Sequence, residues 1–140
     1  MQDFNLTALE REYVIDIDMT DYDNIRTCCQ GKKLCEKCWI YIRAAYDVLK
    51  VILKETFGFK HILWVFSGRR GLHAWVCDHE AKIMSKKIRK SVTNFLNLTI
   101  NSDKVDYLIK DTLINKRKEY PMVTTAYKIL LKYKNFLINE

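Results

Sequence analysis

Tyr13-Val-Ile-Asp-Ile-Asp-Met-Thr-Asp-Tyr-Asp23 combines strand-forming residues with closely spaced carboxylates. Its aromatic and β-branched residues predict a β-strand over residues 12–19. Side chains two apart on a strand share a face, so Asp16 and Asp18 are expected to stand roughly 6–7 Å apart along it. Such carboxylates repel each other and are costly to desolvate, and a shared Mg²⁺ or Mn²⁺ ion relieves both costs. The simpler interpretation is a strand end whose aspartates point into water.

Length and composition are typical of a single domain or part of one. The chain has 140 residues, of which 49% are hydrophobic, with one proline and 4 glycines. None of its apolar runs approaches the ~18 residues that a membrane-spanning helix needs, so we expect no membrane partner. Residues 1–12 are polar and acidic, which does not fit a secretory signal peptide.

The net charge of +7 is unevenly distributed along the chain. Residues 1–24 hold seven acids and one base, whereas residues 79–140 hold 13 Lys and Arg against 6 Asp and Glu. An acidic pole beside a basic body suits a metal site that handles polyanions such as nucleotides or nucleic acid. Ordinary surface charge that keeps a protein soluble is the alternative.

Four of the five cysteines fall within eleven residues, in the pattern Cys28-Cys29-x5-Cys35-x2-Cys38. The C-x-x-C half has the spacing of a thiolate pair that binds zinc. Without a secretory signal, metal binding is favoured over disulfides, and four thiolates indicate a closed structural site. Unligated thiols or a redox pair are the alternatives, and Cys77 is expected to be a non-ligand.

The rest of the pattern predicts an α/β (α+β) domain. We expect a small mixed or antiparallel sheet, one helix packed across it, and a helical C-terminal part. The continuous apolar run from His61 to Phe66 predicts a strand covered on both faces. The short turn after it predicts antiparallel pairing with the next strand, and Asp78 is a candidate helix cap. Beyond the first strand, the expected elements are helices over 36–57, 79–96, 103–118 and 121–138, and strands over 61–66 and 72–77.

A second group of polar residues occupies the turn Ser67-Gly-Arg-Arg-Gly-Leu-His73. Its two glycines permit a close approach of backbone to a ligand. Arg69 and Arg70 offer forked donors suited to phosphate oxygens, and Ser67 can add a hydroxyl donor. Alone, the pattern is also compatible with an ordinary hairpin turn and with a core histidine at His73.

A basic helix face follows Asp78, and more bases lie beyond it. Such a face can track a nucleic-acid backbone, although a charge run is more often a solvated surface. The residues concerned are Lys82, Lys86, Lys87, Arg89 and Lys90, followed by Lys104, Lys110, Lys116, Arg117 and Lys118.

Taken together, these motifs closely resemble the small, catalytic subunit of eukaryotic DNA primase, of the archaeo-eukaryotic primase superfamily. The match covers residues 12–80 in order, whereas residues 81–140 resemble the family only as helices. The motifs are Val14-Ile-Asp-Ile-Asp-Met-Thr-Asp-Tyr-Asp23, Cys28-Cys29 with Cys35-x-x-Cys38-Trp39, Phe57-Gly-Phe-Lys-His61, and Leu63-Trp-Val-Phe-Ser-Gly-Arg-Arg-Gly-Leu-His-Ala-Trp-Val-Cys-Asp78.

This resemblance implies an enzyme that makes short RNA primers on single-stranded DNA from nucleoside triphosphates. It also implies a heterodimer with a large, iron–sulfur subunit, bound to DNA polymerase alpha in the nucleus. Asp16 and Asp18 match the aspartates that bind the catalytic Mg²⁺ or Mn²⁺ ions. The other implied sites are the triphosphate-binding residues Ser67, Arg69, Arg70 and His73, and the structural zinc ligands Cys28, Cys29, Cys35 and Cys38.

The sequence departs from the family pattern in one respect. The third metal carboxylate of the family comes from a strand far downstream, which has no counterpart in this sequence. Asp21, Asp23 and Asp78 are acids near the site, and none of them is assigned that role. We therefore expect a central fragment of the catalytic subunit, inactive in primer synthesis when isolated.

Two other functional classes fit parts of the same pattern. One is a zinc-stabilised nucleic-acid-binding module without catalysis, which would use the basic helices and would not need Asp16 or Asp18. The other is a metal-dependent nuclease, because paired aspartates with metals also cleave phosphodiesters. The paired arginines favour a triphosphate over a backbone phosphate.

Overall fold

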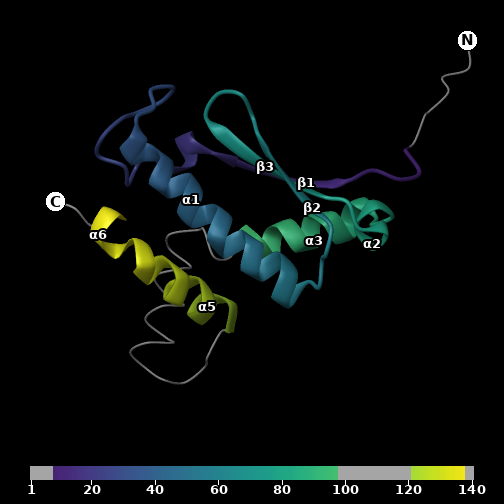
Figure 1. Cartoon of the computed structure of the whole chain (residues 1–140). Helices are drawn as coiled ribbons and strands as arrows, with labels where there is room; N and C mark the ends of the chain where they lie inside the picture. The colour runs from purple at the N-terminus through teal and green to yellow at the C-terminus, as the bar shows by residue number, and fades with distance from the viewer. Residues whose placement is uncertain (1–7, 98–120, 138–140) are drawn as a thin grey trace, which may run out of the picture.

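A three-stranded antiparallel sheet forms the centre of the chain (Figure 1). The computed structural model describes residues 8–97 and 121–137. The strands stand in the order β1-β3-β2, so the hairpin partner β3 occupies the middle. Their bounds are Tyr13–Asp18 for β1, Ile62–Phe66 for β2 and Gly71–Val76 for β3. The predicted α/β class, the three strands and their antiparallel hairpin are confirmed.

The register of the strands divides the sheet into a covered and an open face. Tyr13 lies opposite Val76, and the residues that follow alternate between the faces because strand side chains have a period of two. The covered face carries the buried residues Tyr13, Ile17, Ala74 and Val76. The open face carries Val14, Asp16 and Asp18 from β1, and Leu63, Val65, His73 and Trp75 from the hairpin.

Helix α1, Glu36–Val51, packs across the covered face and ends in a π-helical turn, Ile52–Thr56. The buried residues of α1 and of its π-helical turn recur at helical spacing, which places Ile42, Leu49 and Leu53 in the core. The charged residues Arg43, Lys50 and Lys54 are exposed. Tyr46 meets Trp64 of β2 edge to face, with ring centroids 4.7 Å apart. The predicted helix over 36–57, packed across the sheet, is confirmed.

The expected single helix over 79–96 is wrong, because the structure has two helices there. Helix α2 is His79–Lys82 and helix α3 is Lys86–Asn97. The Ser85 hydroxyl accepts a hydrogen bond from the Ile88 N–H (3.3 Å), so Ser85 caps the start of α3. The buried Arg89 donates to the carbonyls of Ala81 and Lys82, which takes up acceptors at the end of α2.

Asp78 does not cap α2 with its side chain, contrary to expectation. Its carboxylate accepts hydrogen bonds from the backbone N–H groups of Lys60 and His61, at 3.0–3.2 Å and 3.0 Å. The His61 Nδ1 lies 3.2 Å from the same carboxylate. Asp78 therefore fastens the two ends of the β2–β3 hairpin together, because these residues flank the hairpin on either side.

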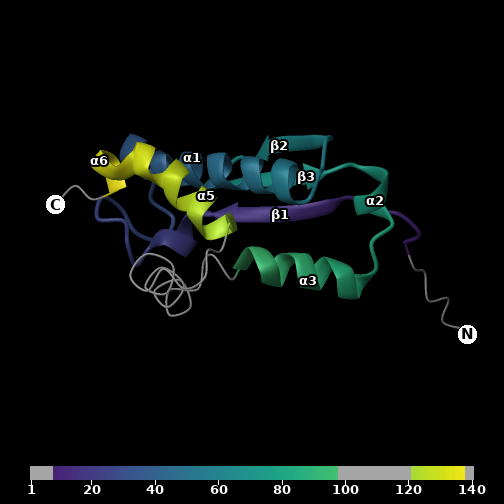
Figure 2. The same cartoon turned by 90° about the horizontal axis from the view of Figure 1, so that it is seen from below.

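Helix α3 covers the same face of the sheet as α1, beneath β1 (Figures 1 and 2). The Tyr13 hydroxyl lies 2.8 Å from the Thr93 hydroxyl of α3. Phe95 of α3 meets Phe57 edge to face at 5.6 Å, which joins the end of the π-helical turn to α3. However, Ile83, Ile88 and Phe95 are 38–54% exposed, so the apolar side chains of this region are only partly buried.

A C-terminal helical segment packs along α1. It consists of α5 (Pro121–Leu130), a 3₁₀ turn (Leu131–Tyr133) and α6 (Lys134–Leu137). Pro121 opens α5 as predicted. The Tyr133 hydroxyl donates to Asp47 of α1, which ties the two helical layers together. The helix expected over 103–118 lies outside the described residues.

The outer strand β2 is not covered on both faces, which corrects the expectation from its apolar run. Leu63 is 59% exposed and Phe66 is 51% exposed. Trp64 contacts α1, whereas Leu63 and Val65 lie on the open face of the sheet. The apolar run therefore continues onto a face that α1 does not cover. Within the described part of the chain, no helix combines the length and apolar character needed to cross a bilayer.

Candidate functional site

Two carboxylates stand on the open face of the sheet, at the C-terminal end of β1. Asp16 lies opposite His73 and Asp18 lies opposite Gly71 in the β1–β3 register. The Asp16 side chain is 65% exposed and the Asp18 side chain 30%, so both are accessible to solvent. The alternation inferred from the sequence therefore places both side chains as predicted.

Asp18 is held by neighbours on two sides. Its Oδ1 accepts hydrogen bonds from the Thr20 N–H and the Thr20 hydroxyl, both at 2.9 Å. The Arg70 Nε donates to both carboxylate oxygens, at 2.7 and 3.0 Å. The Arg70 hydrogen bond is the main cause that holds the pKa of Asp18 well below its ordinary value. Asp18 is therefore ionised at any pH near neutrality and presents a fixed negative charge.

Asp16 has a different partner. The His73 Nε2 lies 3.2 Å from the Asp16 Oδ1, across the β1–β3 pair. The two residues share the open face, so His73 is not the core histidine that the sequence left as an alternative. The structure thus brings two acid–base pairs, Asp16 with His73 and Asp18 with Arg70, onto one surface.

The turn between β2 and β3 brings Arg70 to this surface. Gly68 adopts φ = +82°, a conformation that favours glycine. The Ser67 N–H donates to the Gly71 carbonyl (3.0 Å), and the Gly71 N–H donates to the Ser67 hydroxyl oxygen (2.9 Å). Ser67 therefore accepts a bond that closes the turn, and its own hydroxyl hydrogen is not used in that contact.

Gly71 is required by close packing against β1. A Cβ atom at this position would lie 2.8 Å from the Ile17 carbonyl oxygen and 3.6 Å from the Asp16 Oδ1. Any larger residue would push the turn away from the carboxylates. Arg69 lies exposed at the tip of the same turn, whereas Arg70 is half-buried against Asp18.

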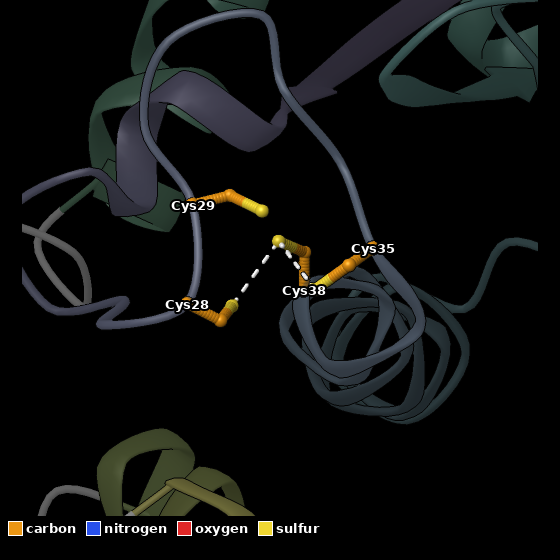
Figure 3. Close-up of side chains that lie close together, drawn as sticks. All are labelled: Cys28, Cys29, Cys35 and Cys38. Atoms are coloured by element: carbon orange, nitrogen blue, oxygen red, sulfur yellow. Dashed lines mark hydrogen bonds between the residues drawn. The ribbon is translucent and has the colours of Figure 1, made fainter.

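The second candidate centre is the cysteine cluster, in which four thiols converge from a loop and from α1 (Figure 3). The sulfur atoms of Cys28, Cys29, Cys35 and Cys38 all lie within 4.8 Å of one another. Tetrahedral Zn–S bonds of about 2.3 Å require sulfurs about 3.8 Å apart, and the Cys28–Cys38 and Cys35–Cys38 separations are 3.3 and 3.6 Å. The donor set and its spacing fit one zinc ion.

The surroundings of the thiols shift the pKa values of Cys29 and Cys35 in opposite directions. The Cys38 backbone N–H, at the start of α1, is the main cause that lowers the pKa of Cys35 to about 7. Burial, together with the neighbouring thiols, raises the pKa of Cys29 to about 12. A metal cation at the centre of the cluster would remove the repulsion between neighbouring thiolates. Cys77 lies apart, with its thiol directed at the Trp75 carbonyl (3.4 Å).

Comparison with known proteins relates this chain to a protein family. A model of the DNA primase small subunit matches residues 15–137. The chain belongs to the DNA primase small subunit family. It is 44% identical over 122 residues to the DNA primase small subunit of Schizosaccharomyces pombe, covering 87% of this chain and 26% of that protein. It is 54% identical over 93 residues to that of Drosophila melanogaster, covering 66% of this chain and 21% of the relative.

An archaeal relative extends the family further. The small primase subunit PriS of Thermococcus kodakarensis is 30% identical over 122 residues, which covers 85% of this chain and 32% of the relative. The chain therefore spans about a fifth to a third of the length of these curated relatives. The primase resemblance inferred from the motifs is confirmed.

Among the described residues, the basic surface is smaller than the sequence predicts. Lys86, Lys87 and Lys90 are exposed on α3. Arg89, however, is 8% exposed and donates to backbone carbonyls, including those of Arg11 and Glu12 at 2.6 and 2.8 Å. Arg89 is thus a structural residue that ties α3 to the segment preceding β1. The bases at 104, 110 and 116–118 lie outside the described residues.

Sequence reasoning missed three residues that shape the two centres. Thr20 donates twice to Asp18, and Asp23 and Arg26 form an ion pair inside the cysteine loop. The spacing of Asp23 and Arg26, three residues apart, was the available signal. It was weak because such pairs are common on surfaces, and only the fold shows that Arg26 is buried.

Proposed function

We propose that this chain forms the metal- and nucleotide-binding part of a primase catalytic subunit, which makes short RNA primers on single-stranded DNA during replication. The observation that carries the proposal is the open sheet face, on which Asp16 and Asp18 stand beside the Arg-Arg turn. Accessible carboxylates and guanidinium groups on one surface suit a triphosphate that is bound together with divalent cations. The full activity extends beyond this chain, which spans a fraction of its relatives.

Each residue has a chemical role in this proposal. Asp16 and Asp18 would hold Mg²⁺ or Mn²⁺, which when bound lowers the pKa of an attacking hydroxyl and stabilises the leaving pyrophosphate. Arg69 and Arg70 would neutralise and orient the triphosphate. His73 and the Ser67 hydroxyl would donate hydrogen bonds to phosphate oxygens. The cysteine cluster would hold zinc away from the chemistry, because four thiolates leave no position for water or substrate.

The partners and location in this proposal follow from the family. They are a single-stranded DNA template, an RNA primer, the large primase subunit and the DNA polymerase alpha complex, in the nucleus. The eukaryotic relatives, which are DNA primase small subunits, support this assignment.

Metal-dependent nucleotide binding tests the proposal directly. ATP binding to the 140-residue chain would be measured by calorimetry with and without Mn²⁺. We expect weak binding that Mn²⁺ strengthens at least tenfold, and Asp16→Asn should remove that gain. Asp21→Asn is the matched control, because Asp21 is an exposed acid just beyond the strand.

Two outcomes would favour other functions. A nucleic-acid module predicts no metal-dependent ATP site and unchanged binding of single-stranded DNA in Asp16→Asn. A nuclease predicts Mn²⁺-dependent cleavage of labelled single-stranded DNA.

In a full-length small subunit, Asp16→Asn with Asp18→Asn should abolish primer synthesis on a pyrimidine template, and retained synthesis with unchanged metal dependence would contradict the assignment. The isolated chain is expected to make no detectable primer.

A further inference from the structure

Arg26 is a fully buried cation in the loop that carries the first two cysteines. Its side chain has 0% relative exposure, although it lies in the irregular loop between the 3₁₀ helix Met19–Tyr22 and α1. A buried guanidinium is costly unless each of its donors is satisfied. Arg26 meets this requirement through one carboxylate, two backbone carbonyls and one thiol.

The backbone contacts of Arg26 determine the course of the cysteine loop. Its Nη2 donates to the Gly31 carbonyl (2.8 Å) and its Nη1 donates to the Lys33 carbonyl (3.1 Å). Both acceptors lie between Cys29 and Cys35, in the part of the loop that must turn back toward α1. Arg26 therefore fixes the turn that brings the two halves of the cluster together.

Asp23 holds Arg26 and the same turn at once. Its Oδ1 accepts from the Arg26 Nε (2.7 Å), and its Oδ2 accepts from the Gly31 N–H (2.9 Å). Gly31 adopts φ = +58°, which allows the chain to reverse at this point. The Gly31 hydrogen bond is the first of the causes that lower the pKa of Asp23, so this carboxylate is ionised at neutral pH.

One Arg26 contact reaches the cluster itself. The Arg26 Nη1 lies 3.6 Å from the Cys38 Sγ, within hydrogen-bond range of sulfur. Cys38 is the buried member of the four and contacts both Cys28 and Cys35. A zinc ion with four thiolates has a formal charge of −2, so a fixed guanidinium beside the most buried sulfur stabilises the ligated state. The neighbouring lysines, Lys32, Lys33 and Lys37, are by contrast exposed to solvent.

We infer that Arg26 is the positioning residue of the four-thiol metal site, which it organises by clamping the 28–35 loop and donating to the Cys38 sulfur. This inference rests on the proposed zinc site. In other metal sites, residues that hydrogen-bond to the metal ligands orient them, and loss of such a residue weakens metal affinity about 10–100-fold. Arg26 has the same role in this inference.

Zinc competition measures this effect in the 140-residue chain. Zinc content would be determined by elemental analysis, and affinity by competition with a chromophoric chelator. Arg26→Met should weaken zinc affinity about 10–100-fold. Arg26→Lys keeps the positive charge but loses the several donors of the guanidinium. Zinc should still dissociate several-fold faster from this variant than from the wild type. Lys37→Met is the matched control, because it removes an exposed positive charge directly before Cys38.

Replacing zinc by Co²⁺ gives an absorption spectrum that a general loss of stability would not change. The thiolate-to-Co²⁺ charge-transfer bands depend on hydrogen bonds to the sulfurs, so they should shift in Arg26→Lys and stay unchanged in Lys37→Met. If Arg26→Met does not fold, Arg26→Lys decides the question by the same two measurements.

Each result has a distinct meaning. Wild-type protein without zinc, when folded and reduced, would overturn the metal site and this inference with it. Wild-type protein with one zinc, together with unchanged affinity and unchanged cobalt bands in both Arg26 variants, would overturn the role of Arg26 alone. Equal losses in Lys37→Met and Arg26→Met would assign the effect to overall charge and would also overturn it.

Discussion

The four thiols and the carboxylate face differ in how the chain assembles them. The thiols come from eleven consecutive residues, 28–38, and the deepest of them is fully buried. The carboxylates meet their partners across the sheet, and Asp18 and Arg70 are separated by 52 positions in the sequence. A closed local site suits a permanent ion, whereas an open face assembled from distant segments suits ligands that arrive and leave.

The two centres also use arginine in different ways. Arg26 is buried and its donors are directed mainly at the loop's own backbone. Arg70 is half-buried at the surface and pairs with a carboxylate that the metals would also use. The first arrangement stabilises a shape, and the second leaves a charged group within reach of a ligand. This contrast predicts that substitutions at one centre leave the other centre intact.

The largest effect is expected from Cys38→Ala. It removes the thiol that contacts two others and should lower the zinc content from about one ion per chain to none, with loss of structure in the cysteine loop. Elemental analysis and circular dichroism measure both effects. Cys77→Ala is the control and should keep its zinc. A Cys38→Ala protein with full zinc content would show that the cluster is not the binding site.

Asp78→Asn should weaken the hairpin that carries the Arg-Arg turn, while the zinc content stays unchanged. The loss of a charged acceptor for two backbone N–H groups should lower the free energy of unfolding by about 2 kcal/mol at pH 7. Chemical denaturation measures this difference.

The pH dependence of Asp78 supplies an internal check. Burial alone would raise its pKa, but the hydrogen bonds from Lys60 and His61 outweigh burial and lower it below the ordinary value. A lowered pKa means that the stabilisation is complete above about pH 4 and is lost as the pH falls through the folded-state value. The difference between wild type and Asp78→Asn should therefore shrink in acid, and a difference that grows there would contradict this account.

The smallest effects are expected at the two arginines of the turn. Arg69→Ala and Arg70→Ala should each weaken Mn²⁺-dependent ATP binding by about tenfold, if one charge-assisted contact to phosphate is lost. Of the two, Arg70→Ala should also raise the pKa of Asp18 toward its ordinary value, because Arg70 is the arginine that donates to this carboxylate. NMR titration of the Asp18 carboxyl group distinguishes the two variants. Reduced affinity for single-stranded DNA with unchanged ATP binding would instead place the arginines on the nucleic-acid path.

Much of the fold follows from local patterns that the sequence displays directly. The strand over 13–18, the helix from Glu36 and the hairpin around Gly68 have the predicted positions, because periodicity and turn glycines act within a few residues. The break between α2 and α3 was not predictable in this way. It depends on Arg89, which reaches carbonyls of both α2 and the segment before β1, more than seventy residues away.

The sequence by itself determined the family and the shared face of Asp16 and Asp18, since residue identity and strand alternation are properties of short segments. Only the tertiary structure decided which charges are buried and which partners they have. It places Arg26 and Arg89 in the interior, Asp78 on the Lys60 and His61 amides, and Arg70 against Asp18. Burial and long-range hydrogen bonds depend on how distant segments pack, and a linear pattern contains no record of that packing.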